Sequence, residues 1–247
     1  NLFESPNLDY HLPSPLQVAS IFKKSGLEYN SAATLDPNLA DGYTTEIKQM
    51  LNFGVYSADM AYCVLNNQAN EGRRYLVVIT DLAAKIGMET VFENKDLMER
   101  FDDHMDNKDS IEVIMIDIHS RTEEYMDEND TRYKESIHFA GAWAEGMYLG
   151  VYDFENNKDK EDVGSRVAEQ MAILENIIHG LEDPRNDGME LDWLVSEMKQ
   201  IQTTFNNFAS VKDYFNNPDA NVLVLTNKEN DSLGSLIKNL RKKITEE

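Results

Sequence analysis

Residues 191–208 read LDWLVSEMKQIQTTFNNF, and this stretch shows most directly how the chain folds. Its apolar side chains recur at intervals of three and four residues, the spacing of one helix face: Leu191, Leu194, Met198, Ile201, Phe205 and Phe208. Residues 163–181, VGSRVAEQMAILENIIHGL, repeat this spacing from Val163 to Leu181. A half-buried strand would place apolar residues at every second position instead. Both stretches therefore predict amphipathic helices.

The distribution of helix-breaking residues extends this prediction to most of the chain. None of the six prolines lies between Asn38 and Asp183, and only 12 of the 247 residues are glycine. Proline and glycine disfavour a helix more than any other residue, so this composition favours long helices over strands. We predict an all-α fold with an N-terminal arm over residues 1–14. A single domain of about eight or nine mostly antiparallel amphipathic helices then covers residues 15–247.

Local signals give the bounds of these helices. Ser14-Pro15-Leu16-Gln17 predicts a helix start, with Ser14 as the N-cap and Gln17 completing a capping box, and Gly26 suits a left-handed C-cap. Residues 108–128 contain a short strand-like alternation, but their longer apolar spacing is helical, so we predict a helix. Residues 222–225 could be extended. The predicted helices span residues 15–25, 45–68, 72–86, 89–104, 108–128, 131–154, 162–181, 191–208 and about 233–244.

Composition and charge narrow the class of partner. The chain has 23 Lys+Arg against 45 Asp+Glu, a net charge of −22. Nucleic acids and anionic membranes require a basic surface that neutralises phosphate, so we predict binding to neither. The hydrophobic fraction of 41% is too high for a disordered acidic chain. No apolar run approaches the roughly 18 residues of a membrane span.

The cysteines, histidines and motifs give no sign of a cofactor. Cys63 is the one cysteine, so no internal disulfide forms, and its place in a helix predicts a buried, unreactive thiol. A di-iron bundle needs two Glu-x-x-His pairs and two more glutamates, and the chain has the single pair Glu135 and His138. No nucleophile elbow, zinc-protease motif or phosphate-binding loop is present. We predict no metal, no cofactor and no identifiable catalytic residue.

Small residues form one stripe on each of two predicted helices: Gly54, Ala58 and Ala61 on one, and Ala142, Gly146 and Gly150 on the other. One interpretation, which we favour, is a close helix crossing flanked by aromatic packing. The other is a cleft in which the missing side chains leave room for a ligand, with two acids as polar anchors. The candidate ligand-binding residues are then Tyr56, Asp59, Tyr62, Trp143 and Glu145.

The same two helices contain a faint internal repeat. Residues 54–60, GVYSADM, resemble residues 141–147, GAWAEGM, at an offset of 141 − 54 = 87. Each segment is followed by a polar loop and another amphipathic helix. Two explanations are open: duplication of a helical hairpin, or chance similarity between two helices that both need small residues.

Four segments resemble a known group of proteins: LPSPLQVA at 12–19, KSG at 24–26, LNFGVYSADMAY at 51–62 and AGAWAEGMY at 140–148. They are similar to a family of uncharacterised all-helical lipoproteins of anaerobic Gram-negative bacteria. The resemblance covers nearly the whole chain. It implies export, a lipid anchor on a cysteine upstream of Asn1, and a mature domain in the periplasm or at the cell surface. The family has no established activity, so it implies no catalytic residue.

Three functions follow as hypotheses. The first is a non-enzymatic, envelope-tethered helical domain that binds a protein or a small ligand, as the missing catalytic motifs and the resemblance suggest. The second is an enzyme of unknown class that uses Asp59 and Glu145, which requires the two carboxyl groups to converge in a pocket, one with a raised pKa. The third is a cytoplasmic helical adaptor. The residues encoded before Asn1 distinguish the third hypothesis from the others.

Overall fold

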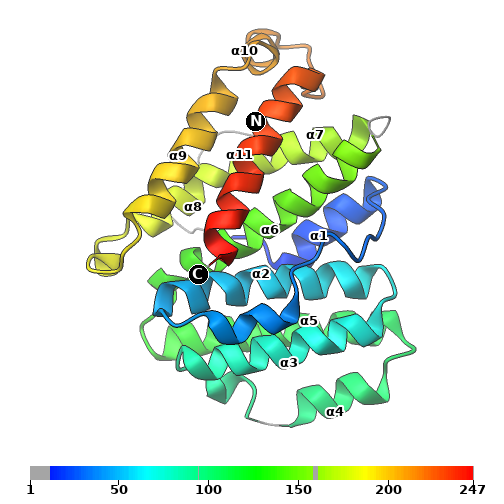
Figure 1. Cartoon of the computed structure of the whole chain (residues 1–247), viewed down its shortest axis with the longest axis vertical. Coiled ribbons are helices and arrows are strands. Elements are labelled where there is room, and N and C mark those ends of the chain that lie inside the picture. The colour runs from blue at the N-terminus through cyan, green and yellow to red at the C-terminus, as the bar shows by residue number, and fades with distance from the viewer. Residues whose placement is uncertain (1–11, 94, 158–160, 247) are drawn as a thin grey trace.

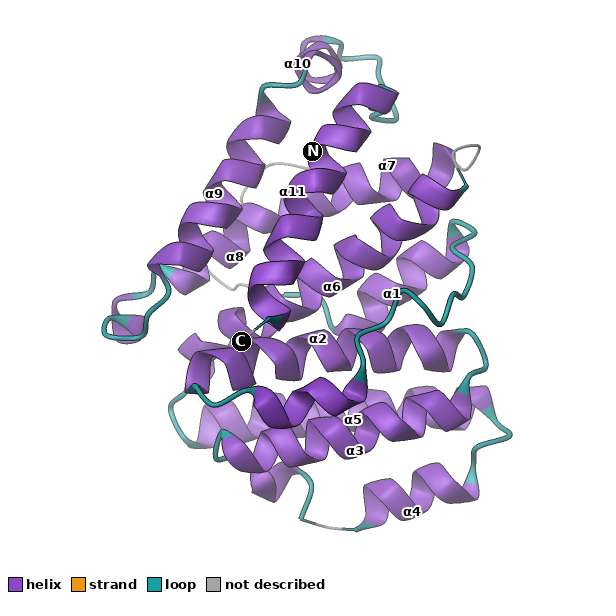
Figure 2. Cartoon of the chain, viewed as in Figure 1, coloured by secondary structure: helices purple, strands orange, loops and turns teal. Residues whose placement is uncertain are grey.

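A computed structural model of the chain describes residues 12–93, 95–157 and 161–246 (Figure 1). These residues contain eleven α-helices and no strand (Figure 2), which confirms the predicted all-α class. The helices are α1 Pro15–Lys24, α2 Glu46–Leu65, α3 Ala69–Lys85, α4 Asp96–Asp103, α5 Lys108–Glu128, α6 Glu135–Asn156, α7 Glu161–Gln170, α8 Leu174–Leu181, α9 Asp192–Asn206, α10 Ala209–Asn216 and α11 Asn227–Thr245. Short 3-10 turns occur at Pro37–Gly42, Glu89–Val91, Arg132–Lys134, Met171–Ile173 and Pro184–Asn186.

The predicted start and end signals of α1 are confirmed. The Ser14 backbone N–H donates to Gln17 Oε1 (2.7 Å), and the Gln17 N–H donates to Ser14 Oγ (3.2 Å), which forms the capping box. Gly26 has a φ of 91°, a left-handed conformation that glycine adopts without steric strain. Most of the predicted arm, residues 1–11, lies outside the described residues.

The structure has more helices than predicted because the predicted helix 162–181 is interrupted. The Gln170 carbonyl accepts a bond from the Trp143 indole N–H (3.1 Å). The Leu174 N–H bonds to the Met171 carbonyl instead, so one 3-10 turn separates α7 from α8. A tertiary contact with α6, which local spacing cannot indicate, therefore accompanies the break.

Other bounds also differ from the prediction. Residues 89–104 form a 3-10 turn followed by α4 rather than one helix. The chain turns at Phe208, whose φ and ψ of −62° and 139° are extended, and the unpredicted α10 follows. Residues 222–225 form neither helix nor strand. Residues 108–128 are helical throughout, as predicted.

The centre of the fold is the crossing of α2 and α6. A Cβ atom added to Gly54 would lie 1.8 Å from the His138 carbonyl oxygen, and one added to Gly141 would lie 1.9 Å from the Leu51 carbonyl oxygen. Each glycine thus faces the carbonyl three residues before the other glycine. No side chain larger than hydrogen fits at either position, so the favoured interpretation of a close crossing is confirmed for this helix pair.

In the second stripe of small residues, Ala142, Gly146 and Gly150, the two glycines do not face α2 as the close crossing predicted. A Cβ on Gly146 would meet Val18 Cγ1 of α1 at 3.3 Å, and a Cβ on Gly150 would meet the Phe22 ring of α1 at 2.7 Å. These two glycines therefore accommodate α1. Gly141, which lies outside the predicted stripe, is the glycine of α6 that contacts α2.

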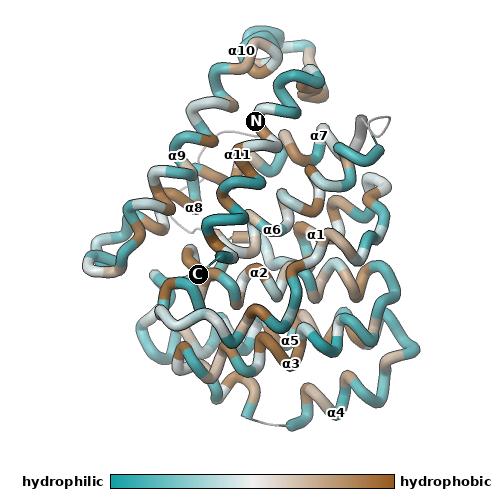
Figure 3. The backbone as a smooth tube through the Cα atoms, in the orientation of Figure 1, coloured by the Kyte–Doolittle hydropathy of each residue, from teal (hydrophilic) through white to brown (hydrophobic). Residues whose placement is uncertain are grey.

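The remaining helices surround this crossing. Helix α3 packs along α2, while α7, α8 and α11 contact α6, and α9 packs against α8 and α11 (Figure 1). Apolar and polar residues alternate along the backbone of these helices (Figure 3). One cluster of buried apolar side chains extends from Leu12 to Ile244. Among the described residues, none of the helices combines the length and apolarity that a bilayer crossing requires.

Candidate functional site

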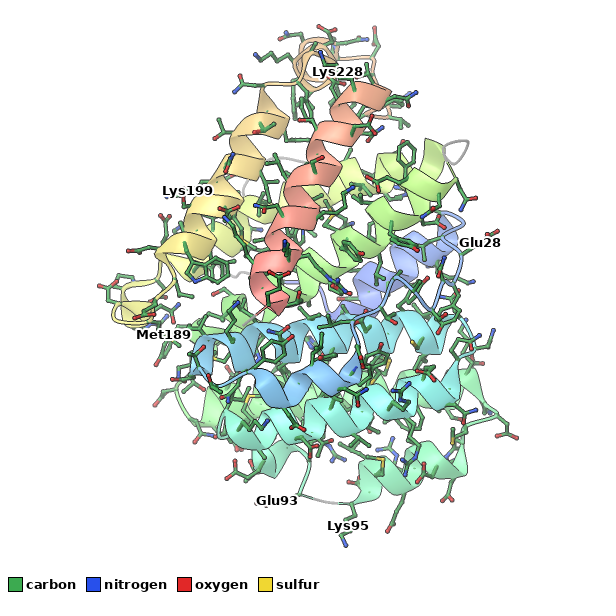
Figure 4. All side chains as sticks on the ribbon, viewed as in Figure 1. Glu28, Glu93, Lys95, Met189, Lys199 and Lys228 are labelled. Carbon is green, nitrogen blue, oxygen red and sulfur yellow. The ribbon has the colours of Figure 1, made fainter. Side chains whose placement is uncertain are left out.

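The five candidate ligand-binding residues are all buried. Tyr56, Asp59, Trp143 and Glu145 have no exposed surface, and Tyr62 is 4% exposed. This burial is unusual for two carboxylates in a chain whose charged side chains otherwise mostly lie at the outside, as Glu93, Lys95, Lys199 and Lys228 do in Figure 4.

The three aromatic candidates join α2 and α6 to neighbouring segments. The Tyr56 hydroxyl donates to the Asp36 carbonyl (2.9 Å), and the Tyr62 hydroxyl donates to the Glu28 carbonyl (2.9 Å). The Trp143 indole donates to Gln170, as described above. A buried hydroxyl or indole requires such a partner, so each ring has a structural role in this fold. Their contact with a ligand stays a prediction.

Asp59 and Glu145 meet in the core, together with Arg241 of α11. Arg241 Nε and Nη2 donate to the two Glu145 carboxylate oxygens at 2.9 and 3.1 Å. The guanidinium also lies 4.2 Å from the ring centroid of Tyr148. Asp59 Oδ2 accepts a bond from the Leu35 N–H (3.1 Å), while Asp59 Oδ1 is buried without a hydrogen-bond partner.

Asp59 lies beside the buried ion pair of Arg241 and Glu145. Burial is the larger cause that raises the pKa of Asp59 well above its ordinary value, and the negative charge of Glu145 is the next. Both causes favour the protonated form of Asp59, because a neutral carboxyl group needs no counter-charge in the core. Convergence and a raised pKa meet two conditions of the enzyme hypothesis, but neither carboxyl group has exposed surface.

A separate cavity lies beside the crossing, between the start of α1 and helices α2, α3, α5 and α6. Its volume is about 80 Å³. Its walls are mainly apolar: Leu16, Phe53, Gly54, Met60, Ile79, Met115, Ile118, Met126, Phe139 and Ala142. We call it the His138 cavity, because His138 is the most buried ionisable side chain that lines it.

His138 is 8% exposed, and its Nδ1 atom is buried without a hydrogen-bond partner. Its ring packs edge-on against Phe53, with centroids 5.2 Å apart. Burial, with a smaller contribution from the positive charge of Lys134, lowers the pKa of His138 to about 3. The imidazole is therefore neutral over the physiological pH range. An unpaired nitrogen in an apolar setting destabilises the fold by about 1–3 kcal/mol, so it favours a partner that completes its bonding.

The mouth of the cavity is acidic and already paired. Glu123 and Glu135 line it, and Arg132 bonds to both, with Nη2 3.3 Å from Glu123 and Nε 3.0 Å from Glu135. His119 Nε2 lies 3.5 Å from Glu123. The Glu135 and His138 pair of the sequence thus shares one cavity. However, within the described part of the chain no three His, Cys, Asp or Glu side chains lie close enough to hold a metal ion.

A larger surface hollow, about 810 Å³, lies between residues 41–48 and 188–193. Lys48 lines it, but its ammonium group donates to the carbonyl oxygens of Ile244 (3.3 Å) and Glu246 (2.5 Å). These bonds satisfy the end of α11, so the cation at this hollow is engaged by the chain itself. No polar group of this hollow is buried and unpaired in the described residues.

Sequence reasoning missed the His138 cavity and Arg241. The cavity walls come from five segments whose side chains meet only in the folded chain, and Arg241 lies 96 residues from Glu145. The one available signal was the Glu135-x-x-His138 spacing, which we had weighed only as a metal motif. Comparison with known proteins adds no assignment: no family model, no curated protein and no solved structure matches this chain.

Proposed function

We propose that this chain is a non-enzymatic binding domain whose ligand occupies the His138 cavity. The observation that carries the proposal is the buried imidazole of His138, which lines a mainly apolar cavity and has an unpaired nitrogen, Nδ1. Ligand sites commonly combine apolar walls with a few polar groups that orient the ligand. Three methionines, Met60, Met115 and Met126, line the cavity, and their flexible side chains adapt to a ligand's shape.

The enzyme hypothesis is the weaker alternative. Asp59 has a raised pKa and lies beside Glu145, two features that acid–base chemistry uses. A substrate must nevertheless reach a catalytic group, and both carboxyl groups are fully covered. Asp59 instead has a structural role, because its bond from Leu35 joins α2 to the loop before the 3-10 turn at Pro37. Glu145 has one too, because its bond from Arg241 joins α6 to α11.

For location, we propose an envelope lipoprotein, on the basis of the resemblance of residues 12–19, 51–62 and 140–148 to helical lipoproteins. A cysteine in a lipoprotein signal upstream of Asn1, and recovery of the protein in the membrane fraction, would support this location. A chain that starts with methionine shortly before Asn1 would favour the cytoplasmic adaptor instead.

We also propose that residues 15–247 act as one domain that contains a duplicated hairpin. The continuous apolar cluster supports the single domain. The reciprocal contacts of Gly54 with His138 and of Gly141 with Leu51 support the duplication, because the offset of 87 residues maps each contact onto the other. Tyr56 and Trp143, which the same offset relates, are both fully buried.

Methyl NMR of methionine-labelled protein tests the binding proposal. A set of small neutral, cationic and anionic compounds should include members that shift the methyl signals of Met60, Met115 and Met126 and leave Met198 of α9 unchanged. Thr122→Trp, which places an indole in the cavity wall, should abolish these shifts. Glu124→Trp, on the exposed neighbouring position of α5, is the matched control and should keep them. If no compound shifts the three cavity methionines, the proposal is refuted.

A further inference from the structure

We infer that the His138 cavity takes a small neutral ring that carries a hydroxyl group, of the phenol type. This inference rests on the proposed function and specifies its ligand. It follows from three properties of the cavity: its size, the unpaired nitrogen in its wall and the charge around its mouth.

Size limits the ligand to a single small ring. The cavity volume is about 80 Å³. An engineered apolar cavity of about 150 Å³ binds benzene, and one water needs about 10–15 Å³ on the same kind of measure. The His138 cavity thus has room for several waters or for most of one six-membered ring, whose polar end would lie at the open mouth or against His138. Drug-sized ligands, which need roughly 300–1,000 Å³, are too large.

The unpaired nitrogen selects a hydroxyl group. A neutral imidazole has one nitrogen that donates and one that accepts a hydrogen bond. A half-turn about the Cβ–Cγ bond exchanges Nδ1 with a ring carbon without a change of shape, so the His138 ring can present either kind of edge to the cavity. A carbonyl group only accepts and an ammonium group only donates, whereas a hydroxyl does both. A hydroxyl therefore completes the bonding of His138 in either tautomer.

Charge excludes ions from this ligand class. The carboxylates of Glu123 and Glu135 repel an anion at the mouth, and the whole chain carries a charge of −22. A cation would be attracted to the mouth, but it would lose its hydration against walls of methionine, isoleucine and phenylalanine. The neutral His138 ring offers no opposite charge to either ion.

Phenol, toluene and benzoate are the probes that test this inference. Phenol and toluene have the same shape and number of non-hydrogen atoms, so their comparison isolates the hydroxyl. Titrations followed by the Met60, Met115 and Met126 methyl signals should give phenol an affinity about threefold to tenfold higher than toluene, the worth of one neutral hydrogen bond. Benzoate should bind more weakly than either.

The variants identify the partner of the hydroxyl. His138→Phe keeps an aromatic ring but removes both nitrogens, so phenol, whose hydroxyl then lacks this partner, should bind no more tightly than toluene. His104→Phe is the same substitution at an exposed position of the chain outside the cavity, and it should keep the preference for phenol. If His138→Phe does not fold, the affinities of phenol, toluene and benzoate for the wild-type protein still test the inference.

Three results would overturn the inference while leaving the proposed function intact: toluene binding as tightly as phenol, benzoate binding most tightly, or a phenol preference that survives in His138→Phe. Absence of any shift in the cavity methionines with all three probes, and with the wider compound set, would refute the proposed function as well.

Discussion

Gly141→Ala should destabilise the fold strongly for a change of one methyl group. The new Cβ would lie 1.9 Å from the Leu51 carbonyl oxygen and 2.7 Å from its carbonyl carbon. Real Cβ atoms keep at least 3.0 Å from such neighbours, so α2 and α6 must separate there by about 3.0 − 1.9 = 1.1 Å. Backbone atoms of a helix cannot rotate away as a side chain can.

The expected magnitude is a balance of three terms, two that destabilise the fold and one that stabilises it. Overpacking of this kind costs about 1–3 kcal/mol, and occasionally more. Separation of the helices also weakens dispersion contacts along the most buried interface of the molecule. Alanine is intrinsically better than glycine in a helix by about 0.5–1 kcal/mol, which offsets part of the loss. We expect a net destabilisation of roughly 1–3 kcal/mol, because the steric term is the larger.

Urea unfolding followed by circular dichroism at 222 nm measures this balance, and Gly146→Ala is the matched control. Its Cβ would meet the Val18 Cγ1 methyl at 3.3 Å, a side-chain atom that can move by a few tenths of an ångström. The helix preference for alanine should then leave Gly146→Ala equal to the wild type or slightly more stable. Equal stability of Gly141→Ala and Gly146→Ala would refute the close crossing as the origin of the glycine requirement.

Four further predictions concern buried ionisable groups: Glu145, Asp59, His138 and Cys63. Glu145→Gln should cost about 3–5 kcal/mol because it leaves the Arg241 charge buried without a counter-charge. Asp59→Asn should cost less than about 1 kcal/mol, since an amide is neutral in the core as the protonated acid is. Native Asp59 keeps a proton that the unfolded chain releases, so the stability of the wild type falls as pH rises above the ordinary pKa of Asp59. The stability of Asp59→Asn relative to the wild type should therefore rise between pH 5 and 8 in urea titrations. A relative stability of Asp59→Asn that falls over this interval would contradict the protonated state of Asp59. The pKa of His138 is about 3 in the folded chain and 6.5 in the unfolded chain, so the free energy of unfolding decreases as pH falls below 6.5. His138→Phe should lack this part of the acid sensitivity. Titration of the His138 imidazole NMR signals near pH 6.5 in the folded wild type would disprove the burial. Cys63, buried with a raised pKa, should react with a thiol reagent at least tenfold more slowly in buffer than in denaturant, and equal rates would show that the helix is open.

Much of the secondary structure could be predicted because its causes are local. The capping box at Ser14 and the apolar spacing of residues 108–128 depend on residues within one or two turns. The break between α7 and α8 could not be predicted in this way. It accompanies a bond from Trp143 to the Gln170 carbonyl, and the two residues lie 27 positions apart. The turn at Phe208 likewise has no proline or glycine to mark it.

The candidate site was harder to predict than the helices. A sequence shows that Asp59 and Glu145 are flanked by small residues, but it does not show what covers them. Arg241, which neutralises Glu145, and Leu35, which donates to Asp59, come from distant segments. The unpaired nitrogen of His138 is equally invisible, because it depends on the absence of partners from every helix packed around it.

The two interpretations of the small residues are related by the geometry of the crossing. Gly54 and Ala142 lie at the crossing, and both also line the His138 cavity. The His138 carbonyl occupies the position of a Gly54 side chain, so the room of the cavity lies beside the crossing and not in the place of that side chain. The room lies on the α5 side of α2, where Phe53, Ser57 and Met60 face the cavity. At about 100° per residue, Asp59 points away from these three side chains, about 127° from their mean direction, and Tyr56 lies between, about 67° from it. Glu145 is seven residues beyond His138, about 10 Å further along α6, and therefore meets α11 instead of the cavity. Small residues thus indicated the helix pair that crosses closely, and the helical period separates the covered Asp59 and Glu145 from the side chains that line the cavity.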